Sequence, residues 1–110
     1  MATARRGLAL AVLILGASIL SANATSGPGC FYVVNVASWD VLNIRSGPSH
    51  RTTVVGTIDP NSHGIISQSG ACLPSGMPLR KRWCPIAHYT GVGTTRGFVK
   101  RHFLAPSDCP

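Results

Sequence analysis

The octapeptide Leu42-Asn43-Ile44-Arg45-Ser46-Gly47-Pro48-Ser49 contains one unit of β structure, a short strand and the turn that ends it. Apolar and polar residues alternate over its first half, so Leu42 and Ile44 are expected to face a core while Asn43 and Arg45 face outward. Pro48 lacks an amide hydrogen and biases the residue before it away from helix. The octapeptide therefore predicts a strand over 42–45 that ends in a chain reversal.

Both sides of the octapeptide repeat this pattern of short strands and tight turns. Alternating or β-branched residues predict further strands over 31–36, 53–58, 65–67, 83–89 and 97–99. No stretch after residue 24 has the apolar periodicity of a helix. The residues thus predict an all-β fold, a small barrel of five or six short strands.

The longest connection, residues 69–82, contains two glycines and two prolines and ends in Arg80-Lys81-Arg82. A solvated loop explains this basic cluster most simply. Alternatively, the cluster forms a cationic face for anionic envelope partners together with Arg96, Lys100 and Arg101.

The first 24 residues have the three parts of a secretory signal peptide. Arg5 and Arg6 precede an apolar run over 8–15, and Ala22-Asn23-Ala24 offers the small residues that a signal peptidase reads. The apolar stretch over 7–20 has 14 residues, short of the roughly 20 that span a bilayer. We therefore predict cleavage between Ala24 and Thr25, no stable membrane insertion after processing, and a secreted or periplasmic protein.

The 86 residues after the signal peptide suffice for one small domain, which excludes multi-domain enzymes and the large α/β folds. Without Arg5 and Arg6 they carry eight basic and three acidic side chains, a net charge of +5. That charge is well below that of a nucleic-acid-binding tail, so no nucleic-acid partner is expected.

Four cysteines in a short exported domain predict two disulfides, with three possible pairings. Cys72 and Cys84 bracket the long connection, so a bridge between them would pin it to the barrel. Cys30 and Cys109 then flank the first and last strands, whose ends often lie close together. We predict Cys30–Cys109 and Cys72–Cys84. Neither the cysteines nor the histidines have zinc-binding spacing, so no metal site and no cofactor is expected.

The octapeptide resembles the opening signature of the bacterial SH3-like (SH3b) family. Later segments fit the same family pattern in spacing, although Phe98 stands where the family usually has tryptophan: 54–58, 83–86, 97–99 and 101–104. The resemblance covers residues 32–105, which leaves 25–31 as a lead-in and 106–110 as a tail. It implies an SH3-like barrel of five to seven strands in an exported protein that binds peptidoglycan or its peptides.

Little in the sequence points to catalysis. The cysteines are expected to be oxidised, no G-x-S-x-G motif occurs, and Asp40, Asp59 and Asp108 are the only carboxylate side chains. The four histidines are scattered and are interpreted as surface residues. We therefore expect a non-enzymatic binding module, a monomer whose partner is peptidoglycan or an envelope peptide or protein. The alternative is a small disulfide-stabilised secreted protein that acts on another protein, as an inhibitor or as a structural accessory of the envelope.

An SH3-like barrel has no spare interior, so a ligand must lie in a groove between loops, here 37–40, 46–52 and 90–96. Trp39, Arg45 and Tyr89 are the predicted ligand-binding residues, two rings for stacking and one guanidinium for a carboxylate. Trp39 sits in a polar turn, where it is either a ligand anchor or a lid over one end of the barrel. The other aromatic residues are expected to fill the barrel: Tyr32, Trp83, Phe98 and Phe103.

Overall fold

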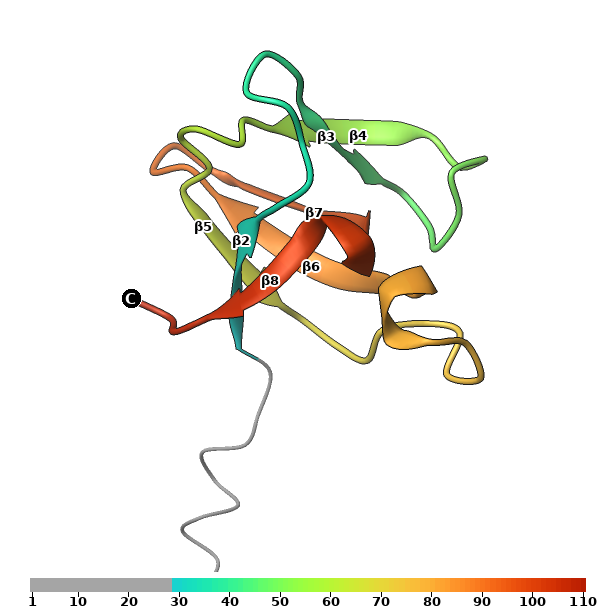
Figure 1. Cartoon of the computed structure of the whole chain (residues 1–110). Coiled ribbons are helices and arrows are strands. Elements are labelled where there is room, and N and C mark those ends of the chain that lie inside the picture. The colour runs from blue at the N-terminus through green and yellow to red at the C-terminus, as the bar shows by residue number, and fades with distance from the viewer. Residues whose placement is uncertain (1–28) are drawn as a thin grey trace, which may run out of the picture.

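The computed structural model describes residues 29–110 and folds them into one antiparallel sheet of seven strands (Figure 1). The predicted signal peptide 1–24 and its cleavage site at Ala24 and Thr25 lie outside the described residues. The strands are β2 (Cys30–Val33), β3 (Leu42–Arg45), β4 (Val54–Ile58), β5 (Ile65–Gln68), β6 (Trp83–Tyr89), β7 (Thr94–Lys100) and β8 (Leu104–Ser107). Two short 3₁₀ helices complete the fold, η3 (Leu79–Lys81) and η4 (Arg101–Phe103). The prediction of an all-β fold with at most seven strands is confirmed.

The sheet has the order β4-β3-β7-β6-β5-β2-β8 and curls around one core. Ile58 on one edge strand and Leu104 on the other edge strand belong to the same buried cluster, which a flat sheet would not allow. Figure 1 shows the strands wrapping around this common interior. Leu42 and Ile44 of the octapeptide are both buried in it, as the alternation predicted. The sheet is therefore a small barrel.

The β6–β7 hairpin forms the centre of the sheet, with a continuous register from Trp83 opposite Lys100 to Tyr89 opposite Thr94. Alternate residues of β6 face the core, and the third of them is a histidine: Cys84, Ile86 and His88. The interpretation of all four histidines as surface residues is therefore wrong for His88. Its Nε2 donates a hydrogen bond to the carbonyl of His63 at 2.7 Å, which satisfies that buried nitrogen.

Strand β2 is shorter than predicted and presents the other face to the core. It ends at Val33, and Asn35 adopts a left-handed conformation with φ 60° that ends the extended run. Phe31 is buried while Tyr32 is 46% exposed, so the prediction that Tyr32 fills the barrel is wrong. Phe31 pairs with the buried Ile66 of β5, and directly opposed residues share one face of a sheet. The pairing with β5 therefore determines which face of β2 is buried.

The sheet extends past both limits expected for the domain, 32 and 105. Cys30 pairs with Ser107 at the outer end of the β2–β8 ladder, so residues of the lead-in and the tail take part in the sheet. The reason is that β8, which lies beside β2 at the sheet edge, continues after Leu104 for three further residues.

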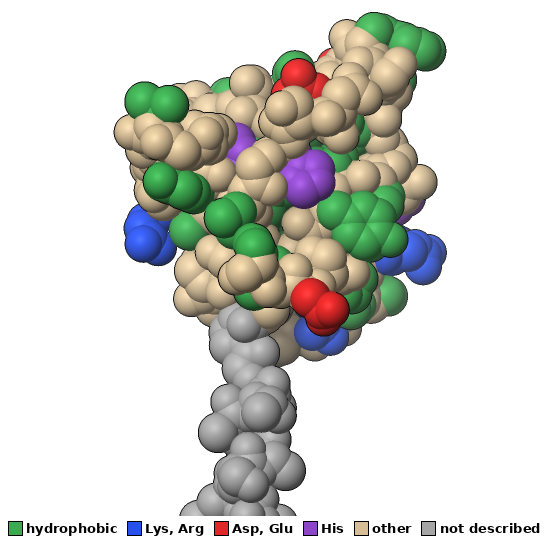
Figure 2. Space-filling model, turned by 90° about the vertical axis from the view of Figure 1, so that its left-hand side faces the viewer, with side chains coloured by type: hydrophobic (Ala, Val, Ile, Leu, Met, Phe, Trp, Pro, Cys, Tyr) green, Lys and Arg blue, Asp and Glu red, His purple; other side chains and the backbone are tan. Residues whose placement is uncertain are grey.

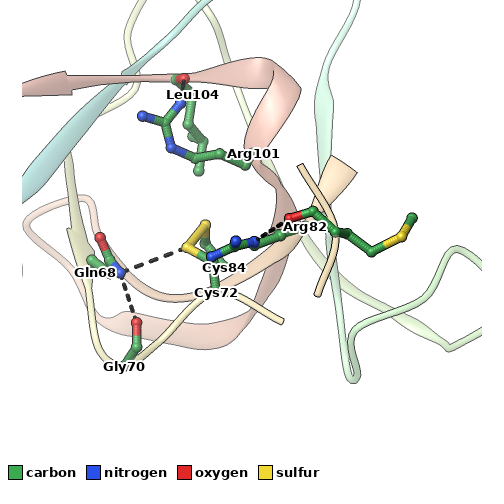
Figure 3. The surroundings of a disulfide bond; sticks show 8 residues. Gln68, Gly70, Cys72, Arg82, Cys84, Arg101 and Leu104 are labelled. Carbon is green, nitrogen blue, oxygen red and sulfur yellow. Dashed lines mark hydrogen bonds between the residues drawn. A yellow bond between two sulfur atoms is a disulfide. The ribbon is translucent and has the colours of Figure 1, made fainter. Parts of the chain in front are cut away.

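Both predicted disulfides are confirmed, Cys30–Cys109 and Cys72–Cys84. The first joins the start of β2 to the chain after β8 with a Cα–Cα distance of 5.0 Å. The second pins the connection between β5 and β6 to the start of β6 (Figure 3). Gln68 supports it, since its Nε2 donates to the Gly70 carbonyl at 2.8 Å and to the Cys72 sulfur at 3.6 Å. Two disulfides are compatible with an extracytoplasmic protein.

Residues 29–110 contain no helix whose length and apolarity would suit a membrane span.

Candidate ligand-binding groove

A groove of about 420 Å³ opens between the β2–β3 connection (residues 34–41) and the end of the sheet where β7 passes into η4. This volume lies within the usual range of small-ligand sites. Its lining comes from the β2–β3 connection, β3, the β3–β4 loop, β6, β7 and η4: Asn35, Val36, Ala37, Asp40, Val41, Leu42, Asn43, Arg45, His50, Trp83, Lys100 and Phe103.

Apolar side chains supported by the core form one part of the lining. Val36 and Phe103 are half-buried and pack against the buried cluster. Trp83 is also half-buried, and the Lys100 Nζ lies 5.9 Å from its ring centroid, within cation–π range. Because Phe103 is braced by the core and Trp83 is half-buried at the start of β6, their exposed edges are held in place before any ligand arrives.

Basic side chains dominate the charged part of the lining. Arg45 and Lys100 line the groove together with His50, whereas Asp40 is the only acidic residue that does so. The Arg45 Nη1 donates to the Thr52 carbonyl at 3.0 Å, so the guanidinium holds the β3–β4 loop against the strand. A guanidinium has five N–H donors, so Arg45 has further donors for the carboxylate of a ligand. The groove therefore suits a ligand with an anionic group.

Hydrogen bonds hold the β2–β3 connection against η4. The Asn35 Nδ2 donates to the His102 carbonyl at 2.9 Å, and the Val34 amide donates to the Phe103 carbonyl at 2.9 Å. Farther along, the Asn61 Nδ2 donates to the Ser38 carbonyl at 2.7 Å. The sequence analysis missed Asn35, although asparagine is among the few non-glycine residues that adopt positive φ readily.

The β3 strand approaches β7 closely beneath the groove, at Gly97. A Cβ atom on Gly97 would lie 2.5 Å from the Arg45 carbonyl oxygen and 2.6 Å from the Ile44 Cγ2. Only glycine allows this approach without a shift of the backbone. Gly97 thus allows β3, the strand that carries Arg45, to lie close to β7.

The structure brings only one of the three predicted binding residues into the groove. Arg45 lines it. Trp39 stands on the β2–β3 connection between two lining residues, yet its ring is 88% exposed and does not line the groove. The interpretation of Trp39 as a lid is therefore wrong, because the ring covers nothing.

Tyr89 lies at the opposite end of β6 from Trp83, where it faces Ile65 and Thr94 across the ladders. Neither Tyr89 nor the predicted loop 90–96 lines the groove. Trp83, which was expected to fill the barrel, supplies the aromatic surface in its place. The ends of β6 are about 20 Å apart at ~3.3 Å per residue, so one groove cannot use both rings.

No group of three His, Cys, Asp or Glu side chains is arranged to hold a metal ion within residues 29–110.

A scan against protein-family models and searches of curated proteins and of solved structures found no match to this chain. The resemblance to the SH3b family therefore rests on residues 42–49 and on the spacing of the later segments. Function must be inferred from the groove itself.

Proposed function

We propose that this protein is an exported, non-enzymatic SH3b-type module whose groove binds a peptide of the bacterial cell envelope, with the stem peptides of peptidoglycan as the first candidate. The single observation that carries this proposal is the composition of the groove. The half-buried rings of Trp83 and Phe103 line the groove together with the basic groups of Arg45 and Lys100. Free carboxylates and short aliphatic side chains, which stem peptides have, fit both parts of this lining.

Polar side chains of the lining support a peptide rather than a purely apolar ligand. Asn43 is exposed on β3 and is one of the residues that line the groove. An amide side chain both donates and accepts, so it can pair with the N–H and C=O groups of a peptide backbone. A peptide bound in this way would form hydrogen bonds through its backbone and would pair its carboxylate with Arg45.

Retention on purified cell-wall sacculi tests this proposal. Lys100→Gln removes a basic group of the lining, and we expect it to weaken retention several-fold. Arg96→Gln is the matched control, because Arg96 is an exposed basic residue of the same strand that does not line the groove. Equal retention of both variants, with both folded, would contradict the assignment of the groove.

A folded wild-type protein that washes off the sacculi would contradict peptidoglycan as the ligand. That outcome would instead favour the alternative function, a small disulfide-stabilised protein that acts on another protein.

A further inference from the structure

Exposed apolar side chains concentrate on the β5–β6 connection (residues 69–82), outside the groove. Leu73, Met77 and Leu79 are 41%, 41% and 48% exposed, and all three lie within seven residues of the chain. Figure 2 shows a contrasting face, where apolar side chains form small groups separated by polar ones and basic side chains lie apart from one another. The connection therefore differs from an ordinary polar loop.

The connection is held in one shape. The Cys72–Cys84 disulfide ties its base to β6, and Leu73 forms two backbone hydrogen bonds with Trp83, at 2.8 and 2.6 Å. The Arg82 side chain also ties the loop together, since its Nε donates to the Met77 carbonyl at 2.7 Å and its Nη2 to the Ser75 carbonyl at 2.9 Å. The exposure of its apolar side chains is thus a fixed feature of the fold.

Several polar backbone groups of the connection have partners within it. The Met77, Lys81 and Arg82 amides donate to carbonyls three residues earlier, at 3.2, 2.9 and 3.0 Å. Pro74 and Pro78 have no amide hydrogen to satisfy. Each of these internal hydrogen bonds lowers the cost of moving that backbone group into a medium poor in water.

Basic side chains adjoin the apolar ones. Arg80 and Lys81 are exposed and directly follow Leu79 in η3. That helix lies against η4, which adds Arg101 and His102 on the same side of the molecule. No acidic residue occurs in the sequence between Asp59 and Asp108, so the connection and η4 contribute only basic side chains to this surface.

We propose that Leu73, Met77, Leu79, Arg80 and Lys81, named here the loop patch, dock the protein peripherally on an anionic phospholipid bilayer. Exposed apolar side chains next to cations, on a loop held in one shape, suit the lipid–water interface. A soluble anionic polymer would use the cations but not the exposed Leu79 and Met77. No residue of the connection lines the groove, although Trp83, the next residue along the chain, does. A protein docked through the connection therefore keeps the groove open.

Co-sedimentation of the disulfide-bonded protein with phosphatidylglycerol and with phosphatidylcholine vesicles tests the proposal. We expect binding to the former and little to the latter. Arg80→Gln with Lys81→Gln should weaken binding roughly 25-fold, about five-fold for each cation near an anionic surface. Met77→Ser with Leu79→Ser should weaken it at least about ten-fold, because it removes the apolar side chains that enter the interface.

Two substitutions elsewhere serve as matched controls. Val92→Ser removes a 95% exposed apolar residue from the β6–β7 turn, and Arg51→Gln removes an exposed cation from the β3–β4 loop. Both should bind vesicles like the wild type. Circular dichroism and non-reducing mass analysis check that every variant is folded and oxidised.

Three results would overturn the proposal. The first is no binding to phosphatidylglycerol vesicles. The second is a loss in the charge variant without a loss in the apolar variant, which would indicate a surface for soluble anionic polymers. The third is equal binding to both lipids. Sacculus retention of the same variants tests the groove separately, so the failure of one proposal is distinguishable from the failure of the other.

Discussion

Two connections of the barrel, residues 34–41 and 69–82, are ordered by different means. Asparagine side chains from Asn35 and Asn61 hold the first by hydrogen bonds to backbone carbonyls. A disulfide and the guanidinium of Arg82, which bonds to two carbonyls of the loop, hold the second. The first becomes a wall of the groove, whereas the second presents exposed apolar and basic side chains. A connection between strands can therefore either line a groove or present an exposed surface, depending on what its polar groups bind.

Removing the Cys72–Cys84 bridge should give one of the largest losses of stability and should affect only one of the two connections. The bridge closes a sequence separation of 12 residues, for which the loss in unfolding free energy is about 3 kcal/mol. We expect Cys72→Ala with Cys84→Ala to lose this amount in urea unfolding and to lose vesicle binding. Sacculus retention should survive.

The reference variant is Cys30→Ala with Cys109→Ala. That bridge closes a separation of 79 residues and should cost about 4.5 kcal/mol. Because it leaves the loop patch tied to β6, vesicle binding should persist under conditions where the protein is folded. Loss of vesicle binding in the reference variant alone would contradict this difference between the two bridges.

A methyl group added at each of two glycines should distinguish the tight contact between β3 and β7 from the open β5–β6 connection. Gly97→Ala places a Cβ against the Arg45 carbonyl and the Ile44 side chain, so we expect a loss of about 1–3 kcal/mol in unfolding free energy. Gly76→Ala meets no atom within 4 Å, and its effect should stay within about 0.5 kcal/mol. Equal unfolding midpoints for both would mean that β3 and β7 are not closely packed.

The hydrogen bond from Asn35 should account for the order of the groove wall. Asn35→Ala removes this bond and leaves a Cβ residue at positive φ, a combined loss of about 1–2 kcal/mol. Asn35→Gly keeps the φ angle and loses only the bond, so it should lie between alanine and wild type in thermal unfolding. Both should weaken sacculus retention without a change in vesicle binding. An effect on vesicles instead would show that the two connections are coupled.

Trp39→Ala should have the smallest effect on folding and tests whether the tip of the groove wall contacts a ligand. The ring is 88% exposed, so the unfolding free energy should change by less than about 0.5 kcal/mol. If Trp39 anchors a ligand, sacculus binding weakens by roughly 1–3 kcal/mol. Unchanged binding would confine the site to the groove lining around Trp83.

The sequence determined the parts of this fold that depend on local chemistry. Alternation in Leu42–Arg45 and the turn at Gly47 and Pro48 predicted β3 and the loop after it, because a strand has two faces and proline cannot continue the ladder. The cysteine positions predicted both bridges, since each pair flanks a segment whose ends must meet.

Only the tertiary structure decided which face of β2 is inside and which rings share the groove. Phe31 and Tyr32 are both aromatic, so alternation could not choose between them until β5 placed Ile66 opposite Phe31. Trp83 and Tyr89 begin and end the same strand, and local pattern carries no information on which end faces the β2–β3 connection. That choice depends on how the sheet curls, a property of contacts between residues far apart in the chain. The same curl leaves Trp39 exposed, turns His88 inward and brings Arg45 beside Lys100.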